Sequence, residues 1–263
     1  MTKRTKILGT VLAVVALSAA VGSFAIDRHY KRRRCSDESG VVNEACLTRN
    51  AIQARYGANL HSQWGEELLV RDFFDDRRDG FFVDIGAGDW SNMNMTLTLE
   101  QKLGWRGIAV DANTAFASGY AQNRPNTRFF TFFVGDKTEA SHPFFVSERW
   151  ALSSGDKKYA DHYGPSKEVK VPAITLNDLL AREKVTKIDF LSMDIEEGEP
   201  AALAGFDIAR FAPELVCIEI HEHVGDKIAA YMSAHGYVVV ERYLPLDNIN
   251  RYYAPRSSKR LRR

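Results

Sequence analysis

The sequence predicts an α/β domain with a mainly parallel sheet, preceded by a single N-terminal transmembrane helix. Short apolar runs alternate with amphipathic segments between about residues 64 and 255, and most of these runs end in glycine or a polar residue. This alternation is typical of a parallel sheet with helices on both faces. An uncharged run at residues 7–26 predicts the membrane helix.

The uncharged run extends from Ile7 to Ile26, and as a helix it matches the roughly 30 Å hydrocarbon core of a bilayer. A cleaved signal peptide is the alternative, because Ser23-Phe24-Ala25 resembles a cleavage site. The dense positive charge at residues 28–34 resists translocation and favours an uncleaved anchor. We therefore expect a single-pass membrane protein whose main domain is cytoplasmic.

Four segments follow from charge and pattern: an anchor with basic flanks (1–34), a linker (35–60), the α/β domain (61–255) and a basic tail (256–263). The net charge is +1, of which the anchor carries +7 and the tail +5, leaving −11 for residues 35–255. Because residues 35–255 are this acidic, we do not expect nucleic acid as a partner. The basic residues at both ends favour contact with an anionic membrane surface. For the C-terminal tail, the alternative is a solvated end without a partner.

The three cysteines, Cys35, Cys46 and Cys217, are few and lack metal-like spacing. They predict neither a disulfide framework nor a zinc site. Cys35 follows a basic run next to the predicted membrane segment, so we expect a free thiol there, with S-acylation as the alternative.

The elements of the domain follow from hydrophobic periodicity. Apolar runs predict strands at 81–85, 108–110, 128–134, 188–193, 215–220 and 237–240, with a seventh at 252–253. Helical spacing predicts helices over 64–77, 94–103, a segment ending near 123, 176–183 with Thr175 as N-cap, and 226–235. Residues 137–170 are less regular and rich in aromatic side chains, and such an insertion is a natural place for substrate contacts.

Polar residues gather where the predicted strands end. In open parallel sheets, ligands bind at these carboxyl ends. The candidates, in strand order, are Asp84 with Gly86 and Gly88, then Asp111, then Asp136, then Asp194 with Glu196, and finally Glu219 with His221.

The loop after the first strand indicates a nucleotide-like ligand. Gly86 and Gly88 allow close backbone approach, and Asp111 can accept hydrogen bonds from ribose hydroxyls. Ser91 stands in place of the third glycine of a dinucleotide fingerprint, which argues against a pyrophosphate ligand. An NAD-dependent oxidoreductase and a glycine turn needed only for packing both remain open on this evidence.

Several blocks in order resemble the FkbM-type family of S-adenosylmethionine-dependent methyltransferases. The first is Phe82 to Gly88, the second is Leu99 to Asn113 with Gly104-Trp105-Arg106-Gly107, and the third is Ile174 to Leu180 followed by Ile188 to Glu199. Together with Asn123-Arg124-Pro125 and Val134 to Lys137, they cover about residues 64–255. There are departures: Glu197 replaces the family's glycine, Asn94-Met95-Thr96 only partly keeps Ser-Asn-Thr, Asp111 stands where Glu is commoner, and Ala112 replaces a proline.

The resemblance implies a Rossmann-like class I methyltransferase with a seven-stranded sheet, a reversed last strand, bound S-adenosylmethionine and usually O-methylation. It implies that Asp84, Gly86 and Gly88 line the methionine end of the cofactor, that Asp111 holds the ribose and that Asp136 lies near the adenine.

Transfer to a hydroxyl benefits from a base. His221 is the first candidate because its ordinary pKa lies near neutrality. Asp194 and Glu196 could orient the acceptor or, with Glu219, bind a divalent cation, although no metal is part of the main prediction. The acids at 196 and 199 could equally serve only to begin a helix.

The predicted function is methylation, on oxygen, of a glycan, lipid-linked sugar or other small metabolite near a membrane. The departures at the site rim motivate a different hypothesis, a catalytically silent scaffold in a membrane complex.

Overall fold

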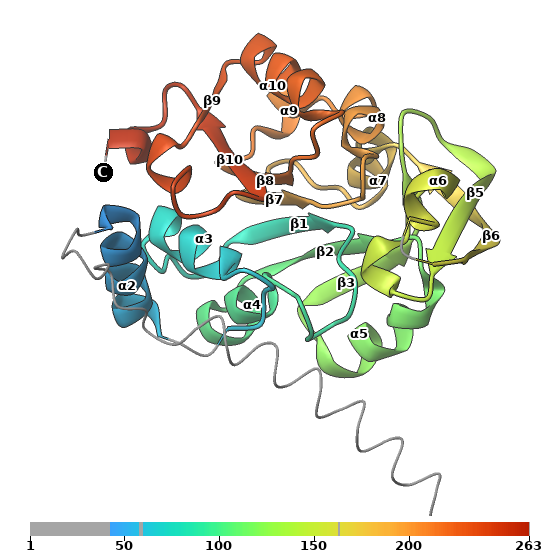
Figure 1. Ribbon diagram of the computed structural model, residues 1–263, viewed down its shortest axis with the longest axis horizontal. Helices are drawn as coiled ribbons and strands as arrows, with labels where there is room; N and C mark the ends of the chain where they lie inside the picture. Colours follow the sequence, from blue (N-terminus) through green and yellow to red (C-terminus); the bar gives the residue numbers. More distant parts are fainter. Residues whose placement is uncertain (1–42, 58–59, 163, 263) are drawn as a thin grey trace, which may run out of the picture. The chain divides into compact units, whose positions relative to one another are not determined.

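The computed structural model describes residues 43–57, 60–162 and 164–262. The chain divides into two units, Met1–Ala58 and Asn59–Arg263. The first unit contains the described helix α2 (Glu44–Tyr56), which begins after the N-cap Asn43. The second unit contains the α/β domain (Figure 1).

Seven strands form the main sheet in the order β3-β2-β1-β7-β8-β10-β9. The parallel members are β1 (Phe81–Ile85), β2 (Arg106–Asp111), β3 (Thr127–Thr131), β7 (Phe190–Met193) and β8 (Leu215–Glu219). Strand β10 (Asn250–Pro255) runs antiparallel to both β8 and β9 (Tyr237–Val239). The predicted Rossmann-like, mainly parallel sheet with one reversed strand is therefore confirmed.

Helices cover both faces of this sheet, as its apolar strands require. Figure 1 shows α8 (Glu199–Ala204), α9 (Ile208–Phe211) and α10 (Gly225–Ala234) on one side, and α4 (Leu97–Leu103) and α5 (Ala117–Asn123) on the other. The remaining helices are α3 (Glu66–Phe74), α6 (Lys157–Ala160), α7 (Leu176–Arg182) and the 3-10 turns η1 (Thr114–Phe116), η2 (Trp150–Leu152), η3 (Glu241–Tyr243) and η4 (Lys259–Arg262). The predicted N-cap of α7 is confirmed, because Thr175 Oγ1 accepts a hydrogen bond from the Asp178 amide at 3.0 Å.

A second, three-stranded sheet lies between the two halves of the main sheet in sequence. It contains β4 (Phe133–Val134), β5 (Glu139–Ser147) and β6 (Ser166–Ile174) in the order β4-β6-β5. The predicted single strand at 128–134 is therefore wrong, because the chain leaves the main sheet at Phe132 and pairs next with β6. The region predicted as irregular contains β5 and the first part of β6, which pair as an antiparallel ladder.

The expectation of a single-pass membrane protein is corrected. Across residues 43–57, 60–162 and 164–262, no helix is both long and apolar enough to cross a bilayer. The predicted transmembrane helix at residues 7–26 falls outside the described residues. The structure thus gives no support to the predicted membrane location or to membrane anchoring.

One of the two described cysteines departs from expectation. Cys46 is disulfide-bonded, whereas Cys217 is a buried free thiol on β8. A lack of regular cysteine spacing argues against a framework of several bridges, but it does not exclude a single one.

The basic tail packs on the domain over its described part. Arg260 lies over the rings of Phe73 and Phe74, with its guanidinium 5.8 Å and 5.6 Å from their centroids. Its Nη1 also donates to the carbonyl oxygen of Phe73 at 3.0 Å. At least this arginine is a structural contact rather than a solvated charge.

Candidate active site

A cavity of about 460 Å³ opens at the carboxyl ends of the parallel strands. Strand order reverses between β1 and β7, and ligands bind at such a switch point in doubly wound sheets. The lining residues come from both sides of this point and from the second sheet; they include Gly86, Gly88, Asp111, Phe133, Phe144, Trp150, Tyr159, Asp194, Glu196 and Glu219.

In the glycine loop after β1, other parts of the protein lie directly against the backbone of Gly86 and Gly88. Gly86 has φ of +80°, and a Cβ there would lie 1.7 Å from the carbonyl oxygen of Asp194. Gly88 has φ of +57°, and a Cβ there would lie 2.7 Å from the ring of Trp150. Both positions need glycine for conformation and for space, so the turn after β1 packs closely against Asp194 and Trp150 at the cavity wall.

Asp111 ends β2 beside this loop. Its Oδ2 accepts the amide hydrogen of Gly88 at 2.9 Å, and its Oδ1 accepts that of Asn113 at 2.7 Å. Burial raises its pKa to about 6, so the side chain is mainly a carboxylate at neutral pH. Since it also lines the cavity, its remaining lone pairs can accept hydrogen bonds from ligand hydroxyls.

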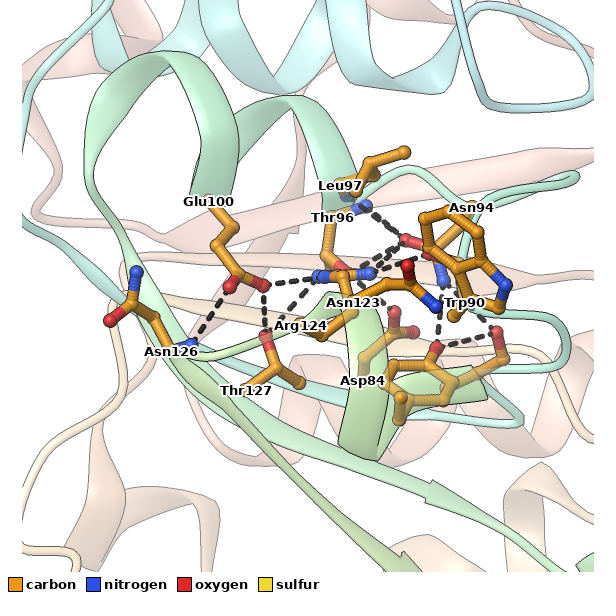
Figure 2. A network of polar contacts seen from close by, with 12 residues as sticks. Asp84, Trp90, Asn94, Thr96, Leu97, Glu100, Asn123, Arg124, Asn126 and Thr127 are labelled. Atoms are coloured by element: carbon orange, nitrogen blue, oxygen red, sulfur yellow. Dashed lines mark hydrogen bonds and ion pairs between the residues drawn. The ribbon is translucent and has the colours of Figure 1, made fainter. Parts of the chain in front are cut away.

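Asp84 lies beneath the loop rather than in the cavity. Its side chain is buried, and its Oδ2 accepts a hydrogen bond from Thr96 Oγ1 at 3.0 Å. Burial raises its pKa, while the hydrogen bond from Thr96 and the charge of Arg124 act in the opposite direction. Figure 2 shows this carboxylate as part of a network of polar contacts that includes Arg124 and Asn94.

Asp136 follows β4 and is exposed, and it is not among the described residues that line the cavity. Near that strand the wall is instead formed by Phe132, Phe133 and Val134. A run of apolar side chains suits a flat ring better than it suits a charged group.

The opposite wall of the cavity carries Asp194, Glu196 and Glu219, and His221 contacts the two glutamates without being among the described residues that line the cavity. His221 Nε2 lies 2.7 Å from Glu219 Oε2 and 3.4 Å from Glu196 Oε2. Asp194 lies within hydrogen-bonding reach of Glu219. Removal from bulk water and the neighbouring charges of Glu219 and Glu196 raise the pKa of Asp194 well above its usual value.

The protonation state of His221 differs from the one its ordinary pKa suggests. Hydrogen bonds to Glu196 and Glu219 raise its pKa to about 10. At neutral pH the ring is therefore an imidazolium, which donates hydrogen bonds and cannot accept a proton. This makes Asp194 the better candidate for the base in this cluster.

Two residues that sequence reasoning missed hold Glu196 in place. The Tyr159 hydroxyl donates to Glu196 Oε2, and Ser154 Oγ donates to the Glu196 carbonyl oxygen at 2.9 Å. Both come from the segment between β5 and β6. The sequence pointed to this segment as a substrate region, but nothing in the pattern singled out Tyr159.

A divalent cation could use part of the same cluster. Glu196, Glu219 and His221 each place one donor atom within 4.8 Å of the others. Two carboxylates and one imidazole form a reasonable donor set, but a metal would have to displace the proton that His221 holds tightly.

The fold and the site define a class. A Rossmann-like sheet with a reversed strand, a glycine loop at the switch point and an acid at the end of β2 are the features of a class I methyltransferase. The model of the FkbM methyltransferase domain matches residues 84–239, which is more than half of the chain, and the chain belongs to this family. Its methyl donor is accordingly S-adenosylmethionine, as expected from the sequence.

Solved structures with similar folds are distant. FkbM methyltransferase from Methylobacillus flagellatus KT is 12% identical, with a TM-score of 0.44 and coverage of 80% of this chain and 60% of that one. A TehB-like S-adenosylmethionine-dependent methyltransferase from Corynebacterium glutamicum is 15% identical, with a TM-score of 0.40 and coverage of 81% and 97%. No curated protein sequence matches the chain.

Proposed function

We propose that the protein methylates a hydroxyl group of a neutral small molecule or glycan. One observation carries the proposal: Asp194, Glu196 and Glu219 line the same cavity as Gly86, Gly88 and Asp111. Groups suited to an acceptor thus share one space with groups suited to the methyl donor.

The residues present fit the donor. The glycine loop lines the cavity without side chains at Gly86 and Gly88, and Asp111 offers carboxylate oxygens to the ribose hydroxyls. When bound, S-adenosylmethionine supplies a methyl group already activated by its sulfonium sulfur. The protein's own task is therefore to orient the acceptor oxygen and to remove its proton.

Asp194 is the proposed base. It accepts the hydroxyl proton as the new carbon–oxygen bond forms and the carbon–sulfur bond breaks, and it later releases that proton to water. Burial and the charges of Glu219 and Glu196 raise its pKa, so its unprotonated carboxylate is a stronger proton acceptor than that of an ordinary aspartate. The carboxylate of Glu196 positions the acceptor, and imidazolium His221 holds Glu196 and Glu219 through hydrogen bonds, so that neither residue takes the proton.

The charge of the cavity favours a neutral acceptor over a phosphorylated one. Among the described lining residues there is no lysine or arginine, whereas Glu66, Asp111, Asp194, Glu196 and Glu219 are all acidic. A phosphate would meet like charge without a guanidinium or ammonium partner. The cavity is also lined by aromatic side chains, which suit the apolar face of a sugar or other ring: Trp64, Phe132, Phe133, Phe144, Trp150 and Tyr159.

Turnover of the full-length chain tests the proposal. Neutral sugars, glycosides and phenols are offered as acceptors beside their phosphorylated counterparts. Formation of S-adenosylhomocysteine measures turnover, and mass spectrometry and NMR identify the methylated position of the product. We expect an O-methyl ether from a neutral acceptor and a loss of about a hundredfold or more in kcat for Asp194→Asn. Methylation on nitrogen, or a preference for the phosphorylated series, would contradict it. Donor binding without turnover on any acceptor would favour the silent scaffold.

A further inference from the structure

Arg124 is a fully buried arginine close to the glycine loop after β1 (Asp84 to Asn94), here called the donor loop because it lies at the site of the methyl donor. It follows α5 directly, and its side chain has 0% exposure. Its Nε donates to Glu100 Oε2, and the two form an ion pair. A buried pair of this kind is tolerated only when its remaining donors and acceptors are satisfied.

The remaining donors of Arg124 all have partners. Nη1 donates to the Trp90 carbonyl oxygen at 3.0 Å and to Asn94 Oδ1 at 3.1 Å. Nη2 donates to Thr96 Oγ1 and Thr127 Oγ1, each at 3.2 Å. Figure 2 shows the planar guanidinium at the centre of this network, between Glu100 and Asn94. Only a planar group with five donors can serve so many acceptors at once.

The network has two sides, and one of them leads to the donor loop. Asn94 Nδ2 donates to the carbonyl oxygens of Ala87 and Asp89, both at 3.1 Å. Ala87 lies between the two glycines and lines the cavity. Thr96, which Arg124 also contacts, hydrogen-bonds Asp84 at the base of the same loop.

The other side leads away from the loop. Glu100 Oε1 accepts the amide hydrogen of Asn126 at 2.9 Å, and its Oε2 accepts the hydroxyl hydrogen of Thr127. These contacts join α4 to the start of β3 and touch no residue of the loop. The two sides can therefore be perturbed separately.

We propose that Arg124 is a positioning residue for methyl-donor binding, which acts through Asn94 and Thr96 on the loop from Asp84 to Asn94. The guanidinium fixes the Asn94 amide, and the amide fixes the carbonyl groups of Ala87 and Asp89. The loop is then held in its binding conformation before the donor arrives, which reduces the entropy lost on binding. The proposal rests on the family's use of S-adenosylmethionine but not on the identity of the acceptor.

The test compares matched variants of the full-length chain by calorimetric titration with S-adenosylhomocysteine, at a temperature where circular dichroism shows every variant folded. Arg124→Lys keeps the positive charge but loses the planar guanidinium with its five donors. Asn94→Ala keeps the ion pair between Arg124 and Glu100 but removes the hydrogen bonds to the carbonyl oxygens of Ala87 and Asp89. We expect both to raise Kd about tenfold or more, the usual effect of losing a buried hydrogen bond. Hydrogen exchange should also show faster amide exchange at residues 86–95 in both.

Thr127→Val is the matched control, because it removes a contact of the same guanidinium on the side away from the loop. It should lower the melting temperature while Kd stays within about twofold. Equal Kd for the wild type, Asn94→Ala and Arg124→Lys would overturn the proposal, as would a loss for Thr127→Val equal to that for Asn94→Ala. A wild-type chain that binds no S-adenosylhomocysteine would instead contradict the donor site itself.

Discussion

Two consecutive glutamates adopt left-handed backbone conformations at the acidic wall. Glu196 has φ of 54° and Glu197 has φ of 73°. The resembling family carries glycine at the position of Glu197, and the structure supplies the physical reason, since only glycine adopts this region without strain. What the sequence showed as an unexplained departure is thus a strained residue beside Glu196.

Glu197→Gly should therefore stabilise the protein. Relief of the left-handed conformation outweighs the greater freedom of glycine in the unfolded chain, so we expect a gain of up to about 1 kcal/mol in the free energy of unfolding. Urea denaturation measures it. Glu222→Gly, at an exposed residue without positive φ, is the control and should give no gain.

His221 should contribute stability that depends on pH. Its pKa is raised from 6.5 to about 10 in the folded state, so the contribution is fully present below about pH 6.5 and is lost as the pH rises through 10. His221→Gln should cost about 2 kcal/mol at neutral pH, the usual value of hydrogen bonds to a charged group. The difference from wild type should shrink near pH 10.5, and NMR titration of the imidazole checks the pKa directly. An imidazole that titrates near 6.5 would refute this role.

At the scale of elements, β1 and β7 pair as neighbours, and the chain just past each of them meets at Gly86 and Asp194. A Cβ at this position would lie 1.7 Å from the Asp194 carbonyl oxygen, whereas a Cβ at Gly236, also at positive φ (+76°), would meet no atom within 4 Å. Gly86→Ala should abolish donor binding and lower the melting temperature sharply. Gly236→Ala should show only the backbone strain of about 1 kcal/mol and bind normally. Similar behaviour of the two variants in thermal melts and titrations would show that the close approach is unimportant.

The segment between β5 and β6 reaches the acidic wall through Tyr159. Burial and the neighbouring carboxylates raise the pKa of its hydroxyl, so this group stays protonated and continues to donate to Glu196 over the whole working range. Tyr159→Phe should lower kcat about tenfold by loosening Glu196, while the Kd of the donor stays the same. Steady-state kinetics measures kcat, and calorimetry measures the Kd of the methyl donor. A change confined to the donor Kd would contradict the role of Tyr159 in holding Glu196.

Hydrophobic pattern identified β1, β2, β7 and β8 because most of their residues are buried. It failed at Phe132, where an apolar run continues although the chain passes from one sheet to another. It also missed β5 and β6, which are partly exposed and carry polar residues such as His142 and Lys170. Pairing between distant residues decides such strands, and local pattern contains little of that information.

At the scale of the whole molecule, the acids that follow predicted strands were expected to lie together, because the carboxyl ends of parallel strands meet at one edge of the sheet. Gly86, Gly88, Asp111, Asp194 and Glu196 all line the cavity, as this reasoning required. It could not tell that Asp84 supports the loop from below, or that Asp136 is exposed, since both depend on loop geometry. The protonation of His221 also depends on two partners that meet only in the fold.

The central claim is a methyl-donor site at the ends of β1 and β2, and calorimetric titration of the full-length chain with S-adenosylmethionine tests it most directly. We expect binding in the micromolar range, weakened about tenfold or more by Asp111→Ala, which removes the carboxylate that lines the cavity. A well-folded wild-type chain that binds no donor, or that binds it equally well after Asp111→Ala, would contradict the account.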